Sequence, residues 1–238
     1  HKYLIMGKGF DEYADAYDAW FLDNRNVLYS ELNLVASVVK GARKVLSVGC
    51  GSGLFEKLLR DERGINITDG IEPSTGMADI ARRRGLNVTV ATAEETDFGH
   101  SDYDLILFNG TPSYIAGLAD VVKKAYDALP AGGRIVLIDV PKESSYGIMY
   151  NLAKALGTWH HPLLEGVYPP NPYPIEFVNV ANWRTTAEKV AMLKDAGFSD
   201  ITFSQTLTAH PLYSDRVEEQ PVEGCDRGDY VAVTAYKK

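Results

Sequence analysis

Three glycines at alternate positions carry the strongest chemical signal in the chain. Gly49, Gly51 and Gly53 follow a short apolar run, residues 44–48, and precede a segment with helical periodicity. Glycines in a strand-to-helix turn allow a tight bend and a close approach of a ligand to the backbone, and the free N–H groups at a helix start favour an anionic group. The turn indicates a nucleotide or nucleoside site, and the alternative is a glycine-rich turn that only packs.

A carboxylate follows the glycines at the sequence separation typical of nucleotide-binding sites. Glu72 ends the next predicted strand, roughly 20 residues after the glycines. A carboxylate there can accept hydrogen bonds from both hydroxyls of a ribose placed over the turn. A dinucleotide fingerprint needs a third small residue where this chain has Leu54, so a pyrophosphate would be held poorly. The two motifs together favour a nucleoside cofactor other than a dinucleotide.

General acid or base chemistry has four weak candidates in the sequence: Tyr114, Tyr146, His160 and His161. The two histidines are adjacent, so their side chains point in different directions, and no third ligand is spaced to complete a metal site. We therefore predict no metal. Cys50 is read as a small residue of the glycine turn, because nothing near it in the sequence would activate a thiolate.

The elements that must position these residues alternate along the chain. Short apolar runs predict strands at 44–48, 67–71, 87–91, 104–109, 134–140, 201–207 and 230–236. Helical patterns predict helices at 54–63, 74–84, 118–129 and 185–196. Continuous apolar runs such as 134–140 are typical of strands buried on both faces, so the pattern predicts an α/β fold with a mostly parallel sheet covered by helices.

Two segments depart from this alternation. Residues 9–40 predict two amphipathic helices broken near residues 23–24, and residues 141–182 are rich in aromatic residues and proline, with a helix expected at 149–156. We expect a single domain, residues 1–238. Its parts would be an N-terminal helical lid (9–40), a cofactor-binding core (44–140), a substrate cap (141–182) and a C-terminal part that completes the sheet (183–238).

Composition limits the partners. The chain has 24 Lys and Arg against 32 Asp and Glu, a formal net charge of −8, which disfavours a nucleic-acid backbone as partner and favours small molecules. No apolar run approaches the roughly 18 residues of a membrane span, and the first residues lack the features of a signal peptide. The default expectation is a cytoplasmic protein with no membrane and no nucleic-acid partner.

Five segments in order resemble motifs of one enzyme family: VLSVGCGSG, IEPSTGMADIAR, VATAEETDF, YDLILFNG and LPAGGRIVLIDV. The sequence is similar to the class I S-adenosylmethionine-dependent methyltransferases, particularly the small-molecule branch that includes the ubiquinone and menaquinone biosynthesis type. The resemblance implies a Rossmann-like, doubly wound, seven-stranded sheet with an antiparallel last strand. It also implies in-line methyl transfer from S-adenosylmethionine to a small-molecule acceptor, with S-adenosylhomocysteine as product.

Carried over position by position, the resemblance implies roles for the first two motifs. Gly49, Cys50 and Gly51 would line the methionine part of the cofactor, with Gly53 completing the turn, and Glu72 would hold the ribose hydroxyls.

The adenine side is implied in the same way. Pro73 and Met77 would flank the ring, and Ala93 and Glu94 match the segment whose backbone approaches it. The family's usual Asp falls on Thr92, whose hydroxyl could accept a hydrogen bond from the exocyclic amine.

The remaining matches surround the reacting methyl group. Asn109 and Gly110 match the end of the fourth strand, and Tyr13 and Tyr17 resemble aromatics that close over the methionine part in relatives; packing in a helix is the alternative role for both tyrosines. Two other functions stay open on the sequence alone. One is a non-catalytic S-adenosylmethionine- or nucleoside-binding regulatory module, and the other an NAD(P)-dependent oxidoreductase, which Leu54 disfavours.

Overall fold

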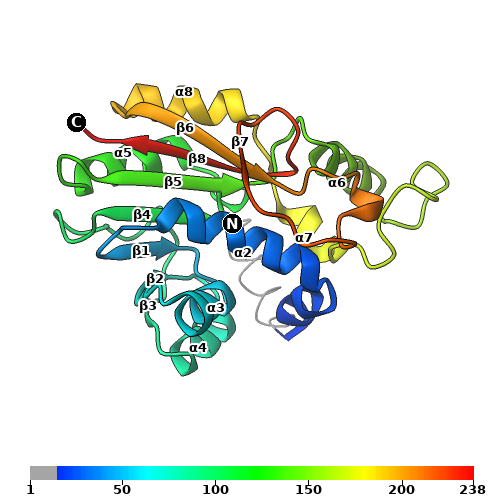
Figure 1. Ribbon diagram of the computed structural model, residues 1–238, viewed down its shortest axis with the longest axis horizontal. Coiled ribbons are helices and arrows are strands. Elements are labelled where there is room, and N and C mark those ends of the chain that lie inside the picture. The colour runs from blue at the N-terminus through cyan, green and yellow to red at the C-terminus, as the bar shows by residue number, and fades with distance from the viewer. Residues whose placement is uncertain (1–14) are drawn as a thin grey trace.

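The computed structural model describes residues 15–238 (Figure 1). Tyr13 lies outside the described residues, so its predicted place over the cofactor stays a prediction. Residues 15–23 form a helix, the chain bends at Asn24, and α2 (Arg25–Val39) follows. The N-terminal segment therefore breaks where the sequence predicts.

A mixed sheet forms the centre of the molecule. Its order is β3-β2-β1-β4-β5-β8-β6-β7. The strands are β1 (Val45–Val48), β2 (Asp69–Ile71), β3 (Asn87–Thr89), β4 (Leu105–Asn109), β5 (Arg134–Asp139), β6 (Ser199–Thr206), β7 (Val222–Glu223) and β8 (Tyr230–Tyr236). β1 to β5 run parallel to one another, and β8 runs antiparallel between β5 and β6.

The Rossmann-like fold class and the antiparallel last strand are confirmed, but the predicted count of seven strands is one short. The additional strand, β7, has only two residues and pairs antiparallel with β6. A strand of two exposed residues leaves no hydrophobic alternation in the sequence, so the pattern does not predict it.

Six α-helices follow α2 within the described residues, and three of them begin at a residue whose side chain accepts a hydrogen bond from the first turn. They are α3 (Leu54–Arg63), α4 (Thr75–Arg83), α5 (Leu118–Ala128), α6 (Ser145–Leu156), α7 (Ile175–Val180) and α8 (Thr186–Ala196). Ser74 caps α4 by accepting from the Met77 N–H at 3.2 Å. Thr185 and Glu188 form a reciprocal capping box on α8. These caps place the starts of both helices within one residue of the predicted ones.

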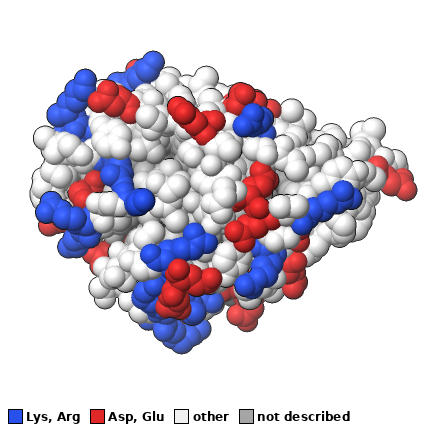
Figure 2. All heavy atoms as spheres, in the orientation of Figure 1, with Lys and Arg blue, Asp and Glu red and all other residues white. Residues whose placement is uncertain are grey.

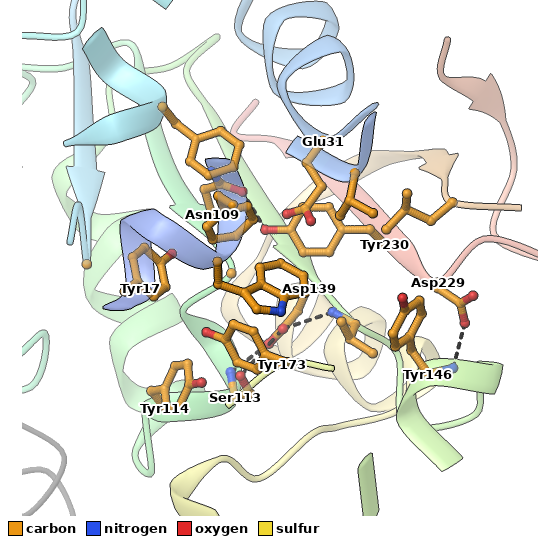
Figure 3. Close-up of a pocket in the computed structure, with 18 of the residues that line it drawn as sticks. Tyr17, Glu31, Asn109, Ser113, Tyr114, Asp139, Tyr146, Tyr173, Asp229 and Tyr230 are labelled. Atoms are coloured by element: carbon orange, nitrogen blue, oxygen red, sulfur yellow. Dashed lines mark hydrogen bonds between the residues drawn. The ribbon is translucent and has the colours of Figure 1, made fainter. Parts of the chain in front are cut away.

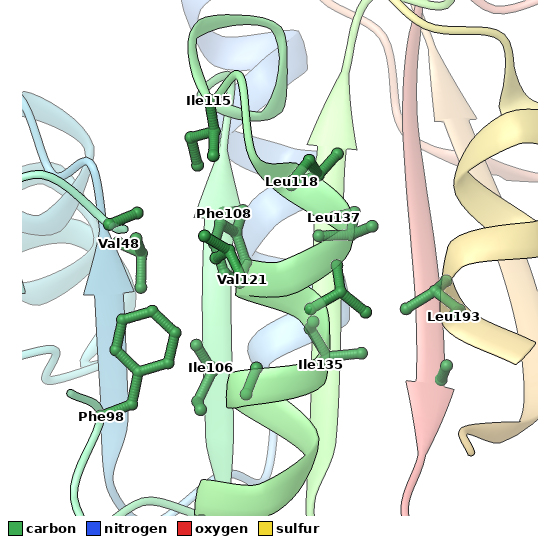
Figure 4. Packing of buried hydrophobic residues seen from close by; sticks show 14 of the residues in the cluster. Val48, Phe98, Ile106, Phe108, Ile115, Leu118, Val121, Ile135, Leu137 and Leu193 are labelled. Carbon is green, nitrogen blue, oxygen red and sulfur yellow. The ribbon is translucent and has the colours of Figure 1, made fainter. Parts of the chain in front are cut away.

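Helices cover both faces of the sheet. One core packs α5 and α8 against alternate residues of β1, β4 and β5, including Val48, Ile106 and Leu137 (Figure 4). The other packs α2 and α3 against the intervening residues, among them Leu107 and Ile138. Because neighbouring residues of a strand point to opposite faces, β4 and β5 are buried on both sides and read as continuous apolar runs.

The predicted cap has its own core. Residues from α6, α7 and the connecting loop gather around Tyr150, Trp159 and Trp183, and the ring centroids of Tyr150 and Trp183 are 4.9 Å apart in a stacked arrangement. The segment contains two helices, α6 and α7, whereas the sequence predicts one, at 149–156. The pattern does not predict α7 because this helix is only six residues long and follows a run of prolines. Within residues 15–238, no helix is long and apolar enough to cross a membrane.

Candidate active site

Two cavities meet at the carboxyl ends of β1 and β4. Open α/β sheets place ligands at this edge, where connections leave neighbouring strands in opposite directions. The glycine-turn cavity is lined by Tyr17, Gly49, Gly51, Glu72, Met77, Asn109, Gly110, Thr111, Tyr114 and Tyr173. The acidic cavity shares six of these residues: Tyr17, Gly49, Asn109, Gly110, Tyr114 and Tyr173. The two cavities therefore adjoin one another.

The glycine turn has a backbone that only glycine adopts readily. Gly49, Gly51 and Gly53 have φ values of +77°, +58° and +73°. The Gly49 N–H donates to the Ile71 carbonyl at 2.7 Å, which fixes the turn to β2. A Cβ on Gly49 would lie 2.3 Å from Thr111 Cγ2, whereas a Cβ on Gly51 would meet only Met77 Cε, at 3.9 Å. The first glycine is required by packing, and the second leaves the backbone open toward the cavity.

Glu72 lies beside this turn with its carboxylate held by the backbone. Its Oε1 accepts from the Gly51 N–H at 3.0 Å and its Oε2 from the Ser74 N–H at 2.8 Å. The residue is 6% exposed. Glu72 is thus presented to the cavity in a fixed orientation, with Met77 of α4 as an apolar neighbour.

Most predicted cofactor residues come together here. Tyr17, Gly49, Gly51, Glu72, Met77, Asn109 and Gly110 line the glycine-turn cavity. Cys50 lines the acidic cavity, and burial raises the pKa of its thiol. Gly53 packs under the turn, where its Cβ position is 3.3 Å from Ala81.

The predicted adenine side is less well gathered. Pro73, Thr92, Ala93 and Glu94 line neither cavity. The Thr92 hydroxyl accepts from the Glu95 N–H at 3.2 Å, and so closes its own turn. Their roles at the adenine ring stay predictions.

The acidic cavity contains four buried carboxylates from four separate elements. Glu31 lies on α2, Glu56 on α3, Asp139 at the end of β5 and Asp229 just before β8. Their exposed fractions are 8%, 4%, 4% and 1%. Among the described residues, no Lys, Arg or His lines this cavity (Figure 3).

Three of the four carboxylates are hydrogen-bonded to the protein. Glu56 accepts from the Ser47 hydroxyl at 3.0 Å, Asp139 from the Ser113 N–H at 2.7 Å, and Asp229 from the Tyr146 N–H at 2.7 Å. Glu31 makes no hydrogen bond and no ion pair with any residue from 15 to 238.

Burial dominates the electrostatics of these groups. Loss of water raises the pKa of Glu31 to about 8, with a further contribution from the Asp139 charge. Loss of water likewise raises the pKa of Glu56 to about 7, and it raises the pKa values of Asp139 and Asp229. A carboxylic acid with a pKa near neutrality can gain or lose a proton as its surroundings change.

Aromatic residues form the rest of the wall. The Tyr230 hydroxyl donates to Asn109 Oδ1 at 2.5 Å, which holds the Asn109 side chain at the junction of the two cavities. The Trp20 ring lies 5.1 Å from the Tyr173 ring, and its Nε1 donates to the Asn171 carbonyl at 3.1 Å. The helix at 15–23 and the cap therefore close over the junction together.

An ion pair fastens this helix to the glycine turn. Asp18 accepts from Arg84 Nη2 at 2.7 Å and from the Ser52 hydroxyl at 2.5 Å. Arg84 also donates to the Ser52 carbonyl at 2.9 Å. The network joins α4, the turn and the helix that carries Tyr17.

The structure separates the four acid–base candidates. Tyr114 and Tyr146 line the acidic cavity, and burial raises the pKa of both phenols, so they act as neutral hydrogen-bonding groups. His160 and His161 line neither cavity. They precede an exposed loop of the cap, where His161 Nδ1 accepts from the Leu163 N–H at 3.1 Å.

Sequence reasoning did not single out Glu31, Glu56, Asp229 or Tyr230. Glu31 lies within the apolar pattern of α2, and a charged residue on the buried face of an amphipathic helix is the signal that could have found it. Tyr230 gives no such signal, because only the antiparallel insertion of β8 brings it beside Asn109.

Residues 20–201 match the family model of a methyltransferase domain, which covers more than half of the chain. The chain belongs to this methyltransferase family.

Three relatives agree with the assignment, two of them over nearly the whole length of both chains. A solved Thermotoga maritima structure, described as a SAM-dependent methyltransferase and possible histamine N-methyltransferase, is 29% identical with a TM-score of 0.80, covering 96% of this chain and 98% of that one. An uncharacterized Methanocaldococcus jannaschii protein is 29% identical over 96% of this chain and 98% of its own length. A malonyl-[acyl-carrier protein] O-methyltransferase of Priestia megaterium is 24% identical over 56% of this chain and 50% of its own.

These findings confirm the predicted class I S-adenosylmethionine-dependent methyltransferase and favour it over the oxidoreductase alternative. They do not specifically support the ubiquinone and menaquinone branch, because the relatives named above are described with other acceptors or with none.

Proposed function

We propose that this protein transfers a methyl group from S-adenosylmethionine to a small-molecule acceptor held under the cap. The observation that carries the proposal is that the glycine-turn cavity and the acidic cavity adjoin, with Asn109 and Gly110 in the walls of both. A donor in the first and an acceptor in the second would face each other across this junction. In-line displacement requires such an arrangement.

The residues of the glycine-turn cavity fit the donor. Glu72 is a buried carboxylate beside the turn and suits ribose hydroxyls, and the open side of Gly51 leaves room for a ligand against the backbone. Met77 offers an apolar surface to a base. When bound, S-adenosylmethionine supplies a methyl group on a positively charged sulfur.

The chain's own contribution is to position the reactants and to exclude water. Tyr17, Trp20 and Tyr173 close the junction from above, where they limit access of solvent to the reacting atoms. No covalent enzyme nucleophile is needed, and burial keeps the Cys50 thiol protonated by raising its pKa. Holding the acceptor atom in line with the methyl group supplies the main acceleration.

Isothermal titration with S-adenosylmethionine and S-adenosylhomocysteine tests the donor site. We expect both to bind, and we expect Glu72→Ala combined with Gly51→Leu to abolish binding by removing the ribose acceptor and filling the open side of the turn. Glu62→Gln, an exposed glutamate on α3, is the matched control. No binding at millimolar ligand, or full binding by the double variant, would contradict the proposal.

Methyl transfer is tested separately with a tritiated methyl donor and a panel of small acceptors. Transfer to at least one compound is the expected result. Binding of the donor without transfer to any compound would instead support the regulatory module.

A further inference from the structure

The acidic cavity is one-sided in charge, unlike the surface of the protein. On the face shown in Figure 2, Lys and Arg side chains lie among Asp and Glu side chains. The cavity has four carboxylates in its wall, and of the described residues that line it none is cationic. Just outside the lining, Lys189, Arg84 and His210 act on Asp139, Glu56 and Asp229 respectively and partly offset their charges. Within residues 15–238, no such cation acts on Glu31. A buried carboxylate that loses hydration without a counter-ion is unfavourable, so Glu31 favours the entry of a cation.

Glu31 is the group that the fold leaves for a ligand. The other three carboxylates accept hydrogen bonds from Ser47, Ser113 and Tyr146. Glu31 is more than nine-tenths buried, lines the cavity and has no hydrogen-bond or ion-pair partner within residues 15–238. Figure 3 shows its carboxylate reaching from α2 toward the side where Asn109 and Tyr230 meet.

We propose that the acidic cavity binds the methyl acceptor as a protonated amine, with Glu31 as its counter-ion. This inference rests on the proposed function, because it names the acceptor class of the same site. An ammonium group carries several N–H donors and a positive charge, and so would satisfy Glu31 and offset the repulsion among the carboxylates.

The aromatic wall agrees with a cationic ligand. Tyr17, Tyr114, Tyr146, Tyr150 and Tyr230 line the same cavity as Glu31. The faces of aromatic rings attract cations and also pack against the carbon skeleton of an amine. A carboxylate acceptor would instead bring a further negative charge to four carboxyl groups, with no cationic side chain among the described lining residues to receive it.

The same residues can manage the proton of the reaction. An ammonium nitrogen must lose one proton before its lone pair can form the new bond to the methyl carbon. As that bond forms, the bond from the methyl carbon to sulfur breaks and its electron pair stays on sulfur. The released proton can pass to a cavity carboxylate, which becomes a carboxylic acid, and burial favours that neutral form.

A metal ion and the sulfonium of the donor are two other cations that the carboxylates of the acidic cavity could bind, and each can be distinguished from an amine acceptor. Within residues 15–238, no group of three or more His, Cys, Asp or Glu is arranged to hold a metal ion. The sulfonium of the donor is the second candidate, and it differs from S-adenosylhomocysteine by one charge. Glu31 serving the sulfonium alone would strengthen donor binding relative to product binding and leave acceptor charge without effect.

The test titrates the S-adenosylhomocysteine complex with three probe amines, phenethylamine, tryptamine and cyclohexylmethylamine. Each is paired with the alcohol and the carboxylate of the same skeleton, such as 2-phenylethanol and 3-phenylpropionate. We expect at least one amine to bind about tenfold or more tighter than both partners, as a charge-assisted hydrogen bond in a buried site allows. Binding of no amine, or equal binding of the alcohol or carboxylate, would overturn the inference.

Glu31→Gln keeps the side-chain shape and removes the charge. We expect it to lose the preference for the amine, with affinity for S-adenosylhomocysteine within about threefold of wild type as evidence that the site is intact. Glu31→Asp should retain part of the preference, and Glu165→Gln, an exposed glutamate in the cap, should retain all of it. An unchanged preference in Glu31→Gln, or a selective loss of S-adenosylmethionine binding, would overturn the assignment of Glu31.

The two proposals fail differently. If S-adenosylhomocysteine does not bind, the proposed function fails. The amine titration, repeated on the protein alone, then still tests whether the acidic cavity prefers amines. If S-adenosylhomocysteine binds and no amine preference is found, the methyltransferase proposal stands and the acceptor class is wrong.

Discussion

The glycine-turn cavity and the acidic cavity are built on opposite principles although they share a wall. In the first, the key carboxylate is already satisfied, because Glu72 accepts hydrogen bonds from the N–H groups of Gly51 and Ser74. In the second, Glu31 is buried without a partner among residues 15–238. A site completed by its own backbone is rigid before the ligand arrives, whereas a site with an unpaired carboxyl group is completed by its ligand.

The largest effect is expected at the turn itself. Gly49→Ala forces a left-handed backbone on a residue with a Cβ and brings that Cβ to 2.3 Å from Thr111. We expect a loss of about 3 kcal/mol in the free energy of unfolding, measured in urea, and loss of S-adenosylhomocysteine binding.

Gly132→Ala isolates the backbone contribution to that loss. Gly132 has φ +85° and open space where its Cβ would lie, so about 1 kcal/mol is expected from strain alone. Equal losses in the two variants would mean that the contact with Thr111 does not fix the turn.

Glu31→Gln should stabilise the protein at alkaline pH. The folded-state pKa of Glu31 is about 8 and its ordinary value is 4.5, so between these values the native state binds more protons than the unfolded state. The free energy of unfolding therefore falls as pH rises through that range, and Gln removes this loss. From pH 5.5 to pH 7.5 we expect wild type to lose about 2 kcal/mol relative to the variant in urea titrations.

Glu56, Asp139 and Asp229 also carry raised pKa values, but they titrate in both proteins, so only the difference between the two curves is informative. Parallel curves would show that Glu31 is not desolvated and would remove the contrast between the two cavities.

A smaller effect is expected where the helix at 15–23 joins the turn. Arg84→Met removes a pair in which the Arg84 and Asp18 side chains are 21% and 12% exposed. We expect about 1 kcal/mol of destabilisation and a few-fold weaker donor binding, because Tyr17 loses its anchorage over the junction.

Arg82→Met is the matched control for this pair. Arg82 and its partner Asp79 are 46% and 59% exposed, and their closest atoms are 3.5 Å apart, so less than about 0.5 kcal/mol is expected. A similar result for both arginines in thermal unfolding and in titration would show that the network does not hold the lid.

The smallest effect is expected in the cap, at His160 and His161. Both lie outside the cavities, so their joint replacement by Ala should change ligand affinity by less than about twofold and stability by about 0.5 kcal/mol or less. Titration of the double variant checks this. A loss of tenfold or more in ligand affinity would show that the histidines belong to the binding site and that the acidic cavity extends into the cap.

The fold was largely predictable because its signals are local. Apolar runs bounded by glycine and proline predicted the longer strands, and helical periodicity predicted helices from residues 74 and 185, where the structure has the N-caps Ser74 and Thr185. The two-residue β7 and the six-residue α7 were missed because each spans fewer than two hydrophobic periods, too few for a repeating pattern to show.

The residues of the two cavities differed in how well the sequence predicted them, again because only local signals can be read from it. Gly49, Gly51 and Glu72 were predicted because the chemistry of that cavity depends on turn conformation and strand ends, which a short stretch of sequence encodes. Glu31 and Tyr230 were missed because each gains its role from a neighbour far along the chain. Thr92 has its hydroxyl engaged with Glu95, a local contact that motif matching does not reveal.

The sequence by itself determined the alternation of strands and helices, the glycine turn and the carboxylate beside it, because backbone conformation and hydrophobic period are properties of neighbouring residues. Only the tertiary structure decided that Glu31, Asp139 and Asp229 share one cavity and that Tyr230 holds Asn109. Those residues lie on α2, at β5 and at the start of β8, and the antiparallel insertion of β8 next to β5 brings the last two together. Burial then makes their charges interact strongly, since water no longer screens them.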